Sequence, residues 1–242
     1  MSVIDRNDLA YWFPLVATAG LRVPHTIIVG CEHDLTCVLD GETPDGWDGL
    51  IADLQAAGDR LGWPCFLRTG HGSGKHDWAN TCHVPSADVL PQHVAALVEW
   101  SHTVDLMGLP TGTWAVRELL DTTPLFRCEG YGGFPVTREF RVFVRDGDVE
   151  HIQSYWPPDA IEQGRPDTPG WRWMLHEAAD LAASEREHLE DMARLACRAV
   201  GGGHWSVDLL QDAHGLWFLT DMADGDRSFR WEPRPREGGE LS

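Results

Sequence analysis

Apolar residues recur along this chain with two different periods. A spacing of three and four residues predicts amphipathic helices over about residues 8–20, 46–61, 87–107 and 184–200. Ser184 with Glu187 predicts a capping box at the start of the last of these helices. Short apolar runs predict strands at 23–29, 64–69 and 113–120. The chain is therefore expected to alternate helices with strands over most of its length.

Two hairpins are predicted in the C-terminal half. The strands 136–145 and 148–155 flank Asp146-Gly147, a residue pair that favours a type I′ turn. A second hairpin spans 205–221, with its turn at 212–215. Because hairpins need antiparallel pairing, the predicted fold class is α+β with antiparallel or mixed sheets rather than one parallel sheet.

The second hairpin carries the two most informative residues of the chain, Asp208 and Asp221. Folding about the turn places Asp208 opposite Leu219, with Asp221 as its diagonal neighbour on the same face, about 7–8 Å away. Two carboxylates at that separation repel each other, and burying both is costly. A Mg²⁺ ion removes this cost, and it is usually held by carboxylates together with substrate phosphates. The alternative is a solvated hairpin with two surface aspartates.

Composition narrows the choice of partners. The chain has 242 residues and a formal net charge of −19, from 19 basic and 38 acidic residues. Binders of nucleic acids and anionic membranes need basic surfaces, so neither partner is expected. No apolar run is long enough to span a membrane, and the start shows no signal pattern, so we expect a cytoplasmic protein. Six scattered cysteines predict free thiols, and Cys31, His33 and Cys37 lack a second ligand pair for zinc.

A glycine-rich loop follows a strand that carries a basic residue. Arg68 lies near the end of this strand, and three glycines between Gly70 and Gly74 precede Lys75. Glycines let backbone N–H groups approach an anion, and a lysine adds positive charge. The segment is not a P-loop, because three residues separate these two glycines instead of four and His76 follows the lysine. The alternatives are a phosphate-binding loop and a flexible surface turn.

The predicted strand at 138–145 has one apolar and one charged face. Phe140, Val142 and Val144 alternate with Glu139, Arg141, Phe143 and Arg145. In so acidic a chain, three arginines within this strand fit an anionic ligand. The alternative is a solvated edge strand.

In their order along the chain, these segments resemble the ATP-grasp superfamily. The order is a strand with a basic residue, a glycine-rich lid loop, a strand ending in an acidic hinge, a Glu-Phe-Arg strand and an acidic hairpin. The last two are similar to eukaryotic cell-division-cycle ATP-grasp proteins that help to assemble a translation initiation factor. Uncharacterised bacterial and phage ATP-grasp proteins are similar at residues 11–14, 67–69, 73–76 and 220–223. The resemblance covers residues 11–231.

The resemblance implies an ATP-grasp fold, in which two α+β subdomains with antiparallel or mixed sheets sandwich a nucleotide. It divides the chain into an N-terminal helix–strand–helix segment at 1–62, a lid subdomain with the glycine-rich loop at 63–120, and a core subdomain with the metal hairpin at 121–231. The polar, proline- and glycine-rich residues 232–242 are expected to form a mobile tail.

The resemblance also implies how a nucleotide would be held. Arg68 takes the place of the basic residue that contacts the α-phosphate, and Lys75 lies in the lid over the β- and γ-phosphates. Glu118 and Leu119 are similar to the hinge that meets the adenine edge. Arg141 is similar to the basic residue of the core that binds phosphates or the intermediate. We expect Arg141 and Lys75 to be catalytic.

Two magnesium ligands are implied at Asp208 and Asp221. A third ligand in the superfamily is usually an Asn two residues after the second acid, and this chain has Ala223 there. Full two-metal catalysis would therefore need Asp224 or a water molecule as a substitute.

The implied activity is that of a Mg-ATP-dependent ligase, which activates a carboxylate as an acyl phosphate for attack by an amine or a thiol. Residues 226–231 are the expected acceptor loop, and the acceptor is a small molecule or a peptide that the sequence does not identify. The alternative is a non-catalytic ATP-binding module that assembles with a protein partner, and Ala223 keeps this alternative open. A single-strand nucleic-acid binder that stacks bases on tryptophans is a weaker alternative, because the net charge opposes it.

Overall fold

The computed structural model describes residues 5–105 and 107–231, so the predicted tail at 232–242 lies outside the described residues. Its helices are α1 (Leu9–Thr18), α2 (Trp47–Leu61), α3 (Leu90–Val104), α4 (Pro158–Gln163), α5 (Trp171–Ala178) and α6 (Ala183–Ala199). Its strands are β1 (Thr26–Gly30), β2 (Cys65–Thr69), β3 (His83–Val84), β4 (Thr113–Glu118), β5 (Phe126–Cys128), β6 (Phe134–Val136), β7 (Glu139–Arg145), β8 (Asp148–Ser154), β9 (His204–Gln211) and β10 (Trp217–Asp224). Short 3₁₀ turns lie at Thr36–Asp40, Lys75–Asp77, Ala87–Val89 and Glu129–Tyr131. None of the described helices is both long and apolar enough to cross a lipid bilayer.

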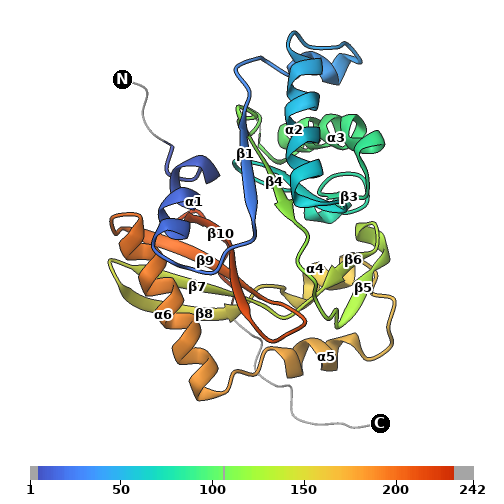
Figure 1. Cartoon of the computed structure of the whole chain (residues 1–242). Helices are drawn as coiled ribbons and strands as arrows, with labels where there is room; N and C mark the ends of the chain where they lie inside the picture. Colours follow the sequence, from blue (N-terminus) through green and yellow to red (C-terminus); the bar gives the residue numbers. More distant parts are fainter. Residues whose placement is uncertain (1–4, 106, 232–242) are drawn as a thin grey trace.

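The N-terminal sheet has the strand order β1-β4-β2-β3, with antiparallel neighbours throughout. Helices α2 and α3 pack against it and share its apolar core, in which Leu54, Leu67, Leu97 and Trp114 are fully buried. Figure 1 shows both helices beside this sheet in the upper half of the molecule. Strand β1 comes from the predicted segment 1–62 and its partners from 63–120, so the two segments share one sheet.

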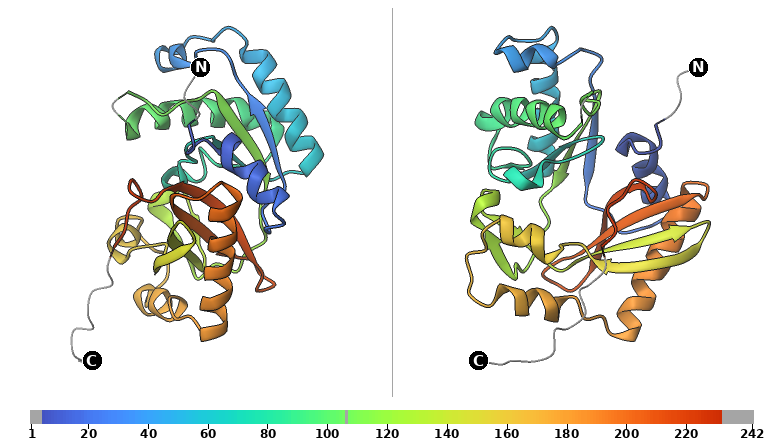
Figure 2. Two further views of the ribbon diagram at one scale, coloured as in Figure 1. Left: turned by 90° about the vertical axis from the view of Figure 1, so that its left-hand side faces the viewer. Right: turned by 180° about the vertical axis from the view of Figure 1, so that it is seen from behind.

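The C-terminal sheet has the strand order β10-β9-β7-β8 and is also antiparallel, so the fold class is α+β as predicted. The turn at Asp146-Gly147 has φ angles of 50° and 95°, as a type I′ turn requires. Helix α6 covers one face with the predicted apolar stripe, which comprises Leu189, Met192, Ala193, Ala196 and Val200. The opposite face carries Arg141, Asp208 and Asp221, because alternate side chains of a strand point to opposite faces. Figure 2 shows α6 on the side of this sheet that is remote from β1 and β4.

A third apolar cluster joins the hairpin of β5 and β6 to α4 and α5. Its buried rings include Trp78, which follows the glycine-rich loop, Phe134 of β6 and Trp156. The rings of Trp78 and Phe134 lie 5.3 Å apart, and those of Phe134 and Trp156 lie 5.0 Å apart. Aromatic packing therefore anchors the C-terminal end of the glycine-rich loop.

The capping box predicted at Ser184 and Glu187 is wrong. The residue before α6 is Ala182, and its N–H donates to the carboxylate of Glu185 at 3.1 Å. The same carboxylate accepts hydrogen bonds from both terminal nitrogens of Arg138. The ion pair with Arg138 holds Glu185 at the start of the helix, and Ala182 has no side-chain oxygen with which to complete a capping box.

The hairpin of β9 and β10 has a different register from the predicted one. Leu219 stands opposite Leu209, and Asp221 stands directly opposite Asp208. Thr220 is an extra residue between these pairs, which makes it a β-bulge. The two aspartates share a face as expected, but they are direct rather than diagonal partners. The predicted pairing is off by one residue already at Trp217, which stands opposite Gln211, and the bulge adds a second residue. The alternation of residue types reveals neither the length of the turn nor the bulge.

Candidate functional site

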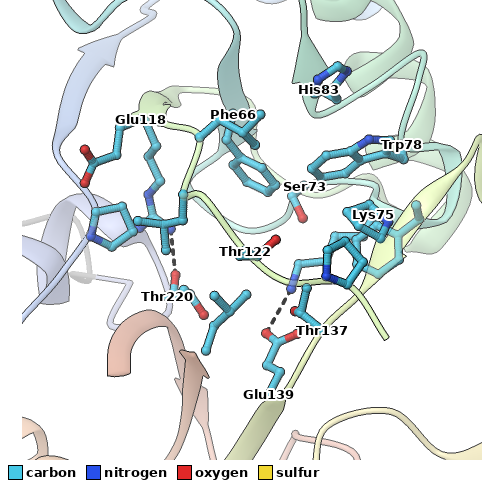
Figure 3. A pocket seen from close by; sticks show the side chains of 18 of the residues that line it. Phe66, Ser73, Lys75, Trp78, His83, Glu118, Thr122, Thr137, Glu139 and Thr220 are labelled. Carbon is cyan, nitrogen blue, oxygen red and sulfur yellow. Dashed lines mark hydrogen bonds and ion pairs between the residues drawn. The ribbon is translucent and has the colours of Figure 1, made fainter. Parts of the chain in front are cut away.

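A cavity of about 530 Å³ lies between the two sheets. Its lining comes from β2 to β7, from β9 and β10, from the glycine-rich loop and from the segment that follows β4. Five of the residues predicted to bind nucleotide or metal line this cavity, namely Arg68, Lys75, Glu118, Leu119 and Asp221. Figure 3 shows Phe66 and Trp78 on one wall, with Thr220 and Glu139 on the facing wall. Arg141 and Asp208 form an ion pair with each other, and Asp208 stands opposite the lining residue Asp221.

One wall of the cavity is apolar and aromatic. The rings of Phe66 and Trp78 lie 6.0 Å apart, and Leu119 and Leu210 add aliphatic surface to the lining. Flat, weakly polar groups such as nucleobases bind well between aromatic and aliphatic side chains. This part of the cavity therefore suits a base rather than a phosphate.

Glu118, the last residue of β4, is bound to His25 in two ways. Its N–H donates to the carbonyl of His25 at 2.9 Å, and its carboxylate accepts the N–H of His25 at 2.8 Å. These bonds fix the side chain of Glu118 to the start of β1. A contact with the edge of a base would consequently come from the backbone at Leu119 and Leu120, which both line the cavity.

Charged side chains from both sheets meet beside this apolar wall. Arg68 of β2 is almost fully buried and contacts Asp221 at 2.9 Å. Arg141 of β7 binds both carboxylate oxygens of Asp208, at 2.7 and 2.8 Å. Arg141, Asp208 and Asp221 are paired neighbours across β7, β9 and β10. The backbone ladder thus fixes the order of this charged row across the sheet.

Lys75 connects the glycine-rich loop to the C-terminal sheet. Its ammonium lies 3.1 Å from a carboxylate oxygen of Glu139, a contact drawn in Figure 3. The ammonium also lies 4.6 Å from the ring centre of Tyr155, which adds a cation–π attraction. Glu139 is buried, and its second carboxylate oxygen has no hydrogen-bond partner among the described residues. The loop is therefore fastened over the cavity by a largely desolvated ion pair.

Burial and neighbouring charges shift several pKa values in the site. Burial raises the pKa of Glu139 above its ordinary value, although the charge of Lys75 opposes this shift. Burial favours a lower pKa for Lys75, but Glu139 and further anionic neighbours outweigh burial and raise it. Burial opposes ionisation of Asp221, but the charge and hydrogen bond of Arg68 outweigh it and lower the Asp221 pKa. At neutral pH, Lys75 and Asp221 are therefore both charged.

Two residues of the site were missed in the sequence. Glu139 shares the charged face of its strand with Arg141, so strand alternation was a signal that could have found it. No pattern in the sequence singled out Arg117 as a residue of the site. It is buried, its Nη1 donates to the carbonyl of Thr220 at 2.6 Å, and its Nε and Nη2 have no hydrogen-bond partner among the described residues. Burial, followed by the charge of Arg68, lowers the pKa of Arg117 to about 9, so it is still protonated at neutral pH.

Asp208 and Asp221, the two predicted Mg²⁺ ligands, are direct partners across β9 and β10. Directly opposed residues have Cβ atoms about 4.5–5.5 Å apart, which lets two carboxylates reach one ion. Across the described ranges, no three His, Cys, Asp or Glu side chains are grouped as metal ligands would be. Phosphate oxygens and waters would have to supply the remaining ligands, as they commonly do for Mg²⁺. Ala223, the position at which the resemblance implies a third ligand, stands opposite Ser206, so a methyl group and a hydroxyl lie there.

We expect the Glu139→Gln substitution to loosen the glycine-rich loop. The substitution removes the negative charge that holds Lys75, and a hydrogen bond to a charged group contributes about 1.5–3 kcal/mol. Amide hydrogen exchange at residues 70–78 should accelerate by roughly tenfold or more, while exchange in α2 should not change. In the wild-type protein, a nucleotide bound in the cavity should slow amide hydrogen exchange at residues 70–78. Equal exchange rates at residues 70–78 in Glu139→Gln and in the wild-type protein would mean that the ion pair does not fasten the loop.

Comparisons with known proteins give similarity in fold only. No protein-family model matches the chain, and no curated protein matches its sequence. D-alanine–D-alanine ligase from Bacillus anthracis complexed with ATP superposes with a TM-score of 0.51 at 13% identity, over 90% of this chain and 53% of that chain. N5-carboxyaminoimidazole synthase from Aspergillus clavatus, in complex with ADP and 5-aminoimidazole ribonucleotide, gives 0.51 at 13% identity, over 90% and 44%. A RimK domain ATP-grasp protein from Sphaerobacter thermophilus gives 0.49 at 12% identity, over 91% and 59%. This chain thus spans about half the length of the solved chains that it matches.

Proposed function

We propose that this chain, which has the fold of ATP-grasp ligases, binds a magnesium–adenine nucleotide between its two sheets and uses it in a ligase reaction. The observation that carries the proposal is the row of Arg141, Asp208 and Asp221, which faces Arg68 and lies beside an aromatic wall. A chain of net charge −19 that gathers arginines in one cavity is suited to a polyanionic ligand.

In the proposed complex, the base would lie against Phe66, and the phosphates would extend towards Arg68. Arg68 is positioned rigidly, because it is buried in β2 and its Nε donates to the carbonyl of Thr69 at 3.0 Å. Lys75 approaches from the loop, and Arg141 approaches from a central strand of the other sheet. The phosphates would consequently be gripped from both sheets, which favours closure of the cavity around the ligand.

For a ligase, the γ-phosphoryl group would pass from ATP to a substrate carboxylate, giving ADP and an acyl phosphate. An amine or a thiol would then attack the acyl carbon and displace inorganic phosphate. Arg141 and Lys75 would balance the charge that spreads over the transferred group, which is the main catalytic need in phosphoryl transfer. Asp208 and Asp221 would hold Mg²⁺, which supplies charge neutralisation at the phosphates.

The segment after β10 is the proposed acceptor side of the site. The carbonyl of Phe229 accepts a hydrogen bond from Gln153 at 3.3 Å and lies 3.5 Å from Nη1 of Arg141. The indole of Trp231 donates to the carbonyl of Ser154 at 3.0 Å. The segment therefore lies next to the arginine that would contact the transferred phosphoryl group. The acceptor, either a small molecule or a peptide, would bind against this segment.

A non-catalytic nucleotide-binding module that grips a protein partner is the second candidate function. The observation that favours it is Ala223, which gives the carboxylate pair no third protein ligand. A ligase should release ADP and phosphate when the correct acid and acceptor are supplied. A binding module should retain Mg-ATP with every small acceptor and turn none of it over, so a phosphate-release assay across acids and amines separates the two.

We expect the Arg141→Ala substitution to weaken binding of a non-hydrolysable ATP analogue with Mg²⁺ by about 1.5–3 kcal/mol, because a charge-assisted contact with the phosphates is lost. Arg145→Ala is the matched control, since Arg145 lies on the same face of β7 but pairs with the exposed Glu150 at 2.8 Å. Titration calorimetry measures both. Wild-type affinity in the Arg141→Ala protein would remove the central support of the proposed function.

A further inference from the structure

The carboxylate pair depends on the bulge at Thr220. From Trp217 to Leu219, β10 pairs with β9 in one register, and from Asp221 onward it pairs in a register shifted by one residue. Without the shift, Asp221 would stand opposite Val207, which is fully buried in the core. Opposed residues of an antiparallel pair share a face, so Asp221 would point into the core. The extra residue therefore moves the Asp221 carboxylate onto the face of Asp208.

A bulge leaves backbone groups outside the strand ladder, and buried backbone groups need partners. Thr220 has partners on both sides. Its hydroxyl donates to the carbonyl of Asp208 at 3.3 Å, and its own carbonyl accepts Nη1 of Arg117 at 2.6 Å. Figure 3 draws the bond that reaches Thr220 from the other sheet. Arg117 lies on β4, immediately before Glu118, so the bond joins the hinge to the bulge.

Packing alone gives little reason for an arginine at position 117. The guanidinium lies over the rings of Phe13 and Trp12, at 5.4 and 6.0 Å from their centres. Two of its nitrogens have no hydrogen-bond partner among the residues that the structure describes. Burying a cation with so few partners is costly, and an apolar residue of similar size would fill the place at lower cost. What a long donor adds here is the bond to the Thr220 carbonyl.

We infer that Arg117 is a positioning residue, which holds the Thr220 carbonyl and thereby fixes the bulge that sets Asp221 opposite Asp208. Its effect on magnesium–nucleotide binding rests on the proposed function, whereas its effect on the bulge does not. Because β4 leads directly into the hinge at Glu118, the same bond ties the placement of the carboxylate pair to the placement of the base.

The first test needs no nucleotide. In Arg117→Met, amide hydrogen exchange at 219–223 should accelerate by tenfold or more, measured by mass spectrometry relative to β7. The control is Leu54→Ala, which opens a cavity in the core of the N-terminal sheet away from Thr220. Leu54→Ala should leave exchange at 219–223 within threefold of wild type. Unchanged exchange in Arg117→Met, or equal acceleration in both variants, would overturn the positioning role.

The second test separates positioning from general binding. The affinity for a non-hydrolysable ATP analogue is measured with and without Mg²⁺, and the ratio of the two affinities isolates the metal-dependent part. Arg117→Met should lower this ratio by tenfold or more, and Arg117→Lys, which retains one long donor, should stay within threefold of wild type. An unchanged ratio in Arg117→Met, or a lysine variant as impaired as the methionine variant, would contradict the inference.

The two tests keep the inference and the proposed function distinguishable. If the wild-type protein bound nucleotide without any dependence on Mg²⁺, the proposed function would fail, while hydrogen exchange at 219–223 would still decide whether Arg117 holds the bulge. If Arg117→Met did not fold, Arg117→Lys and Arg117→Gln would replace it in the exchange test. Arg117→Gln is too short to reach Thr220, so it should accelerate exchange by tenfold or more where lysine does not.

Discussion

The Asp208→Asn substitution is expected to lower the free energy of unfolding by about 3–5 kcal/mol, the usual cost of breaking a buried ion pair by removing one charge. Asp208 is 3% exposed and accepts both arms of the Arg141 guanidinium. Asparagine keeps one acceptor oxygen but leaves the arginine without a balancing charge. Chemical denaturation at neutral pH measures the loss.

The exposed pair of Asp191 and Arg194 provides the control for this experiment. These side chains are 3.0 Å apart but open to solvent, so Asp191→Asn should cost less than about 1 kcal/mol. Repulsion between Asp208 and Asp221 acting alone would give the opposite sign, namely a gain in stability. Equal stability of Asp208→Asn and wild type would mean that the pair with Arg141 contributes nothing net.

The Lys75→Met substitution is expected to destabilise the protein in a pH-dependent manner, by about 3 kcal/mol above neutral pH. It leaves Glu139 buried without its cation, so the Glu139 pKa, already raised by burial, rises further. A carboxyl whose folded-state pKa is raised favours folding below its unfolded pKa and disfavours folding as pH rises through the folded value. The stability of Lys75→Met should therefore approach that of wild type near pH 4 and fall progressively as the pH is raised.

A double mutant identifies the cause of this pH dependence. Adding Glu139→Gln to Lys75→Met removes the titrating group, so most of the lost stability and nearly all of the additional slope with pH should disappear. Thermal or denaturant unfolding at several pH values measures both quantities. If the additional slope with pH survives in the double mutant, another carboxyl group is its cause.

In nucleotide binding, Lys75→Met should reduce affinity less than Arg141→Ala does, because Lys75 reaches the cavity from a loop.

Much of the fold could be predicted because it depends on neighbours in the sequence. The apolar stripe of α6 and the Asp146-Gly147 turn follow from helical spacing and from the φ angles that Asp and Gly tolerate. The alternation in 138–145 correctly places Arg141 on the charged face of its strand. The start of α6 was not predictable in this way, because Glu185 is held by Arg138, which lies 47 residues away in the chain.

For the site, the sequence by itself determined that Glu139 and Arg141 lie on one face of strand β7. The bulge at Thr220, which puts Asp221 on the face of Asp208, became visible only in the structure. Only the tertiary structure decided which partners the charged side chains meet. Lys75 meets Glu139 across 64 residues, and Arg117 meets Thr220 across 103 residues. These contacts join two sheets whose relative position is set by packing between apolar cores, and no local pattern of residue types encodes that position. The bulge at Thr220 also involves a distant contact, because the Thr220 carbonyl accepts a hydrogen bond from an arginine of the other sheet.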